Sequence, residues 1–128
     1  MVTKVLVDSD IERGKLLLES LDRRQTSVVV AFWLYEPDQD RWRLLLASPV
    51  FDQLGPRAAY SLIRQALEDL PEEKRVSFFD ITAANTKDVL VQAIRKFVHT
   101  GPTIANIRLN QSPANGVFID DALVYRTT

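Results

Sequence analysis

The chain has 128 residues, of which 46% are hydrophobic and 26% are charged, and its formal net charge at pH 7 is −1. This length and composition predict a single globular domain over residues 1–128. The near-neutral charge disfavours nucleic acids and anionic membranes as partners. The absence of cysteine excludes disulfides and thiolate chemistry, and the single histidine argues against a structural zinc site.

The sequence contains no signal for export or for membrane insertion. Residues 1–25 lack the apolar core of a secretory signal, and no segment approaches the run of about 20 apolar residues that spans a bilayer. We therefore expect a cytoplasmic protein. The four glycines are scattered at positions 14, 55, 101 and 116, so no phosphate-cradling loop is present and no cofactor is implied.

The first segments predict an N-terminal arm followed by a helix. Residues 1–7 alternate apolar side chains, which fits a short edge strand or a loose arm. The run Asp8-Ser9-Asp10 offers N-cap candidates for a helix that ends near Arg23-Arg24. Gly14 lies on the apolar stripe of this helix. Glycine costs about 1 kcal/mol relative to alanine inside a helix, so its presence indicates close packing against another element.

Residues 26–49 hold both tryptophans and predict an antiparallel hairpin. A turn over Pro37–Asp40 pairs Tyr35 with Trp42, Trp33 with Leu44 and Glu36 with Arg41. Both faces are apolar away from the tip, so the hairpin should be covered on both sides. The first face would carry Val29, Ala31, Trp33, Tyr35, Trp42, Leu44 and Leu46, and the second Val28, Val30, Phe32, Leu34, Leu45 and Ala47.

The remaining segments predict two helices and three strands. Residues 48–55 read as a loop, and a second helix starts at Pro56 and ends before Pro71. A strand over 76–82 is followed by a third helix, capped by Asn85 or Thr86. Segments 103–110 and 117–126 form a closing hairpin around Asn115-Gly116.

These elements follow the order helix, strand, strand, helix, strand, helix, strand, strand. Helical crossovers favour parallel neighbours, whereas hairpins are antiparallel. The predicted fold class is therefore α+β, with one mixed sheet of about five strands and three helices packed against it.

The adjacent acids Asp120 and Asp121 are unusual inside a strand, because successive side chains point to opposite faces. A register that pairs Leu109 with Ile119 places Arg108 opposite Asp120, so a surface ion pair or a β-bulge is the favoured interpretation. An alternative is a Mg²⁺-dependent hydrolase or nuclease. Its polar cluster would contain Asp80, Asp120, Asp121, Asn106 and Arg108.

The tip of the first hairpin is a second candidate site. Trp33, Tyr35 and Trp42 share one face, and Arg41 and Arg43 share the other. Exposed aromatic rings of this kind form stacking platforms or protein contacts. The alternative is that the rings lie beneath a helix as part of the core.

Two further features have weaker functional interpretations. Arg57 stands at the start of the second predicted helix, where an anionic small molecule is favoured, although Pro56 removes one donor. His99 at the end of the third helix is better explained as a structural cap than as a general base. The leading hypothesis is a non-enzymatic module that contacts a partner protein or itself as a homodimer. The hydrolase and the anion binder are the alternatives.

Overall fold

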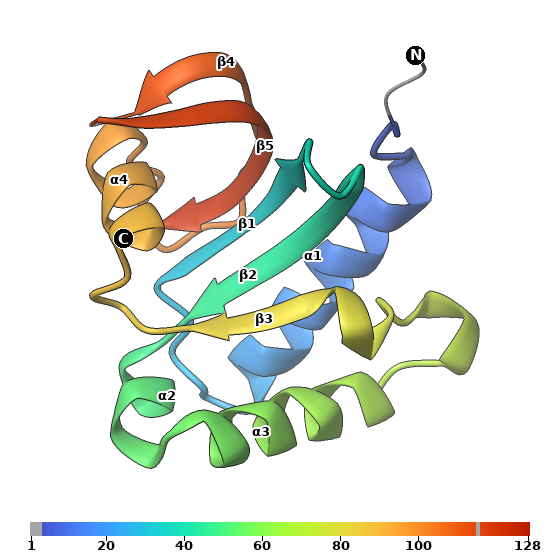
Figure 1. Ribbon diagram of the computed structural model, residues 1–128. Helices are drawn as coiled ribbons and strands as arrows, with labels where there is room; N and C mark the ends of the chain where they lie inside the picture. Colours follow the sequence, from blue (N-terminus) through green and yellow to red (C-terminus); the bar gives the residue numbers. More distant parts are fainter. Residues whose placement is uncertain (1–3, 115) are drawn as a thin grey trace.

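A computed structural model describes residues 4–114 and 116–128 and confirms the predicted α+β class and mixed five-stranded sheet (Figure 1). The strand order across the sheet is β3-β2-β1-β5-β4. Only the β2–β3 pair is parallel among the described strands. The elements in chain order are α1 (Asp8–Arg23), β1 (Val30–Glu36), β2 (Arg41–Ala47), α2 (Pro49–Leu54), α3 (Pro56–Glu68), β3 (Ile81–Ala84), α4 (Val89–Phe97), β4 (Ile107–Ala114) and β5 (Val117–Thr127).

The sheet separates two hydrophobic clusters. Helices α1 and α3 cover one face and α4 covers part of the other, as the arrangement in Figure 1 shows. The central strands β1 and β5 contribute to both clusters, because alternate side chains point to opposite faces. None of the described helices is both long and apolar enough to cross a bilayer.

The predicted hairpin is confirmed with its register. Tyr35 pairs with Trp42, Trp33 with Leu44, and Glu36 with Arg41. The predicted assignment of side chains to the two faces of the hairpin is correct from residue 30 onward and wrong for the residues before it. Val28 belongs to the cluster under α1, whereas Val29 packs against the cluster under α4. The strand begins only at Val30, and Ser27 has a positive φ of 60°, so strand alternation does not extend to these residues.

Two of the three predicted helix starts are corrected by one to three residues. Helix α1 begins at Asp8, and its N-cap residue is Val7, without a side-chain hydrogen bond. The cap of α4 is Asp88 rather than Asn85 or Thr86. Its Oδ1 accepts hydrogen bonds from the backbone N–H groups of Leu90 and Val91, at 2.9 and 3.2 Å. These carboxylate contacts satisfy donors that a helix start otherwise leaves open.

Two segments differ in type from the prediction. Residues 49–54 form helix α2 rather than a loop, because Ser48 accepts from the N–H of Val50 and proline occupies the first turn. The strand expected over 76–82 begins only at Ile81, and Phe78–Asp80 is a 3₁₀ turn. Within the described residues there are thus four α-helices and two 3₁₀ turns, the other over Glu72–Lys74.

Close packing at Gly14 is confirmed. A Cβ atom built on Gly14 would lie 2.3 Å from the hydroxyl of Tyr125 and 2.8 Å from Nε1 of Trp33. The Trp33 indole N–H donates to the Tyr125 hydroxyl at 2.8 Å, and this hydroxyl donates to the carbonyl of Ile11 at 2.6 Å. Burial raises the pKa of Tyr125 well above its usual value. Gly14 therefore lets α1 approach a buried hydrogen-bond chain from β1 and β5.

Both edges of the sheet have features that oppose the addition of another strand. On edge strand β3, the N–H of Ala83 donates to the Tyr60 hydroxyl on α3 at 3.1 Å. Edge strand β4 contains Pro113, and Gln111 has a positive φ of 46°. The N–H of Ala83 is already hydrogen-bonded, Pro113 has no N–H, and the backbone at Gln111 is irregular. Each of these features makes it harder for another strand to pair with the edge.

Candidate functional site

The three aromatic side chains predicted at the hairpin tip are parts of the core. Trp33, Tyr35 and Trp42 retain 3, 6 and 6% of their accessible surface. The Trp42 indole donates to the carbonyl of Lys4 at 3.0 Å, and the tilted Tyr35 and Trp42 rings lie 5.4 Å apart. The three side chains are therefore largely buried, which matches the alternative interpretation that they belong to the core.

The Tyr35 hydroxyl is tied to the turn that follows its strand. It donates to Oδ1 of Asp40 at 2.6 Å, and the same oxygen accepts the N–H of Lys4 at 3.0 Å. This hydrogen bond, with burial and the nearby charges of Asp40 and Asp120, raises the pKa of Tyr35 to about 12. The same hydroxyl holds the pKa of Asp40 below its usual value. The contacts fix the tip against the N-terminal segment.

The two hairpin arginines form hydrogen bonds and ion pairs within the protein. Arg41 Nη2 donates to the carbonyl of Phe79 at 3.0 Å and lies 3.4 Å from Oδ1 of Asp80. Arg43 donates to Oε2 of Glu36 at 2.9 Å and to the Thr82 hydroxyl at 2.6 Å. Both side chains are half-buried.

The structure does not bring the predicted acidic cluster together. Asp80 lies beside Arg41, whereas Asp121 receives two hydrogen bonds of 2.7 Å from Arg108 on β4. Asn106 is exposed just before β4. Across residues 4–114 and 116–128, no three His, Cys, Asp or Glu side chains lie close enough to hold a metal ion.

The expected register of the closing hairpin is wrong. Leu109 pairs with Ala122 and Arg108 with Leu123, so Arg108 meets Asp121 rather than Asp120. Pairing of Ala114 with Val117 leaves only residues 115 and 116 between the strands, a shorter loop than expected. Asn115 of the predicted Asn-Gly turn lies outside the described residues.

The regular alternation of β5 breaks at its two acids. Ile119 and Ala122 both pack into the cluster under α4, although they are three residues apart. The break separates the directions of the two acids: Asp121 reaches Arg108, whereas Asp120 lines a groove on the α4 side. Hydrogen bonding to Asp121 raises the pKa of Arg108, whose guanidinium also lies 5.4 Å from the centroid of Trp42.

The remaining sequence candidates, Arg57 and His99, lie in different segments of the chain, at the start of α3 and after the end of α4. Arg57 is exposed in the first turn of α3, which begins after Gly55. His99 is also exposed and stands two residues beyond the end of α4, rather than in its last turn.

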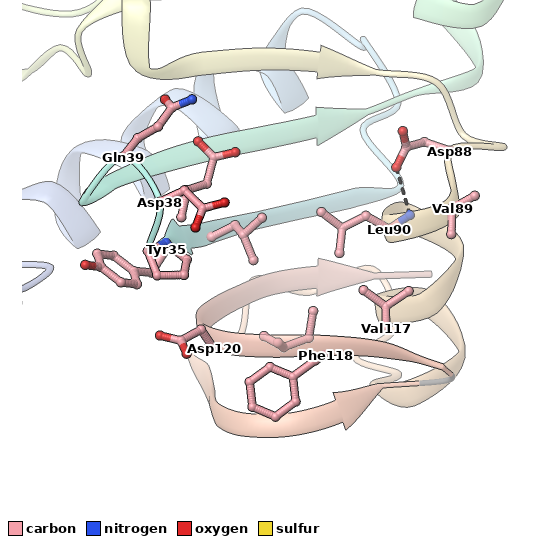
Figure 2. A pocket seen from close by; sticks show the side chains of 13 residues that line it. Tyr35, Asp38, Gln39, Asp88, Val89, Leu90, Val117, Phe118 and Asp120 are labelled. Carbon is pink, nitrogen blue, oxygen red and sulfur yellow. Dashed lines mark hydrogen bonds between the residues drawn. The ribbon is translucent and has the colours of Figure 1, made fainter.

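A groove of about 520 Å³ lies where three segments distant in sequence meet (Figure 2). We call it the α4 groove. Its walls are the hairpin tip, the start of α4 and the start of β5. The lining residues are Leu34, Tyr35, Glu36, Pro37, Asp38, Gln39, Asp88, Val89, Leu90, Val117, Phe118, Ile119 and Asp120.

The groove exists because α4 is only nine residues long and leaves part of the sheet face near the hairpin tip uncovered. Phe118 and Val89 keep 64 and 74% of their surface exposed. Leu34, Leu90 and Val117 are half-buried and pack onto the core cluster beneath. The concave surface thus joins exposed apolar side chains to the hydrophobic core.

The charged residues that line the α4 groove are all acidic: Glu36, Asp38, Asp88 and Asp120. The Asp88 carboxylate accepts hydrogen bonds from backbone N–H groups of α4, and the Glu36 carboxylate forms an ion pair with Arg43. Within the described part of the chain, Asp38 and Asp120 make no hydrogen bond or ion pair of their own. Figure 2 shows these two acids toward the Tyr35 end of the groove, and Val89 and Leu90 at the opposite end.

Sequence reasoning missed the α4 groove. One signal was present: Val117, Phe118 and Ile119 are consecutive apolar residues in a strand, so at least one of them had to face away from the core. Which segments surround that exposed residue depends on the tertiary structure.

The fold and the groove together define an α+β fold with an incompletely covered sheet face. Comparison of the chain with protein-family models, with curated proteins and with solved structures finds no match.

Proposed function

We propose that this protein is a non-enzymatic interaction module that binds a partner protein through the α4 groove. The observation that carries the proposal is the pairing of a concave shape with the exposed side chains of Phe118 and Val89. Apolar patches of this kind, rimmed by polar residues, are typical of protein-contact surfaces. A partner side chain placed there would extend the hydrophobic cluster under α4.

The geometry gives the metal-dependent alternative less support. Asp80 and Asp121 each lie beside an arginine, and Asp120 lines a different surface from Asp80. A hydrolytic metal site requires several oxygen ligands converging on one point.

Site-specific photo-crosslinking in cells tests the proposal. A photoreactive residue replaces Phe118 in one variant and Phe79 in a matched control. Phe79 is 88% exposed on the 3₁₀ turn beside β3, outside the groove. We expect a discrete protein adduct from position 118 and none of the same mass from position 79. Equal adducts from both positions, or no adduct from position 118, would contradict the proposal.

A further inference from the structure

We infer that the segment bound in the α4 groove belongs to a different protein and carries a lysine or arginine close to an apolar side chain. This inference rests on the proposed function and adds the chemistry of the partner. It follows from the charge distribution along the groove and from the consequences of placing a second copy there.

The two ends of the groove differ in chemistry. At the hairpin-tip end stand Asp38 and Asp120, whose carboxylates have no partner within the described residues, and no basic residue lines the groove. At the other end Val89 and Leu90 project from the start of α4, and Val117 of β5 lies near them (Figure 2). A cation at the first end and an apolar side chain at the second would complement both.

A cation is the group that gains most at the acidic end. The charges of Glu36 and Asp88 are already offset, by Arg43 and by the N-terminus of α4 respectively. Asp38 and Asp120 add two negative charges that pair with no cation among the described residues, so the local potential attracts a positive group. The negative charge of Asp120 also helps to raise the pKa of Tyr35, so this charge acts at the same end of the groove.

A second copy of the chain is a poor occupant. An interface related by a two-fold axis brings the same surface of each copy together. Through the α4 groove it would oppose Asp38 and Asp120 to their own equivalents, and juxtaposed like charges are unfavourable. Self-association by strand addition is opposed at both sheet edges, by the Tyr60 contact to Ala83 and by Pro113.

Titration of isotope-labelled protein with three synthetic peptides tests the inference. The first alternates leucine with arginine, the second replaces each arginine with glutamate, and the third replaces each leucine with serine. We expect the first peptide to shift the amide resonances of residues 36, 38, 39, 88–90 and 117–120, and its affinity to fall as salt is added. The other two peptides should bind more weakly at these positions.

The variant Asp38→Asn/Asp120→Asn gives the matched measurement. Because exposed charge pairs contribute modestly, we expect each carboxylate removed to weaken binding of the first peptide by about two- to five-fold. The control Glu72→Gln/Glu73→Gln makes the same change in net charge at an exposed 3₁₀ turn distant from the groove and should leave the affinity unchanged.

The outcomes separate the inference from the proposed function. Equal binding of the arginine and glutamate peptides in the groove, or full binding by the double Asn variant, overturns the cationic inference and leaves a groove that binds apolar segments. Absence of groove shifts with all three peptides also overturns the inference, and the crosslinking at position 118 then decides the function. A dimer in light scattering that Phe118→Asp dissociates would identify a second copy as the occupant instead.

Discussion

Replacing Gly14 with alanine should destabilise the protein, against the intrinsic preference of helices for alanine. In an unconstrained helix interior this change stabilises by about 1 kcal/mol. Here the new Cβ would lie 2.3 Å from the Tyr125 hydroxyl and 2.8 Å from Trp33 Nε1, well inside contact distance. Overpacking of a filled core costs about 1–3 kcal/mol.

Relief of the overlap has its own cost. Moving Tyr125 away from α1 would disturb its hydrogen bonds with Trp33 and with the carbonyl of Ile11. A buried polar group left without a partner costs about 1–3 kcal/mol. After subtracting the helical gain, we expect Gly14→Ala to lower the free energy of unfolding by about 1–5 kcal/mol.

Chemical denaturation monitored by tryptophan fluorescence measures this loss. Lys15, the exposed neighbour in α1, supplies the control, because Lys15→Gly compared with Lys15→Ala reports the helical preference without a clash. In the double mutant Gly14→Ala/Tyr125→Phe, the effects should be less than additive, because the hydroxyl nearest to the new Cβ is gone. A Gly14→Ala variant as stable as the wild type, or more so, would refute the close approach of α1.

Three further predictions concern other parts of the structure. Asp22→Ala should lower the free energy of unfolding by about 1–3 kcal/mol, because it removes the carboxylate that binds the Arg126 guanidinium at 2.8 Å, and this guanidinium is only 7% exposed. Chemical denaturation should show a smaller loss of stability for Asp69→Ala, because its ion pair with Arg24 is exposed. Between its lowered folded pKa and the unfolded value of 3.8, Asp40 binds fewer protons in the folded protein, so stability should fall as pH drops through this range. Tyr35→Phe should make that fall shallower in acid denaturation and remove an absorbance transition near pH 12. Phe118→Asp should stay within about 0.5 kcal/mol of the wild type in thermal melts, because the ring is largely exposed.

Local chemistry was sufficient to predict the first hairpin and the helical stripes. The turn over Pro37–Asp40 fixes the β1–β2 register directly, so the pairing of Tyr35 with Trp42 followed from sequence spacing alone. The apolar segment at residues 76–82 was misleading for the opposite reason. Val76 is buried in the cluster under α1 without being in a strand, and a short apolar run does not specify its backbone conformation.

The pairing of β4 with β5 and the candidate site depended on longer-range structure. The predicted register assumed a longer loop, and the break in alternation at Asp120 and Asp121 has no clear local signal. The α4 groove is formed by the hairpin tip, the start of α4 and the start of β5. Their meeting depends on the strand order, which one sequence without a structure does not supply.

The position of β5 in the sheet has a consequence for synthesis on the ribosome. This strand comes after the other described elements, yet it pairs with both β1 and β4 and supplies side chains to both hydrophobic clusters. A nascent chain that ends before residue 117 lacks the strand that joins β1 to β4, and much apolar surface remains in water. Cooperative folding therefore has to wait for β5 to leave the exit tunnel, and until then the unfinished chain exposes apolar segments that are prone to aggregate.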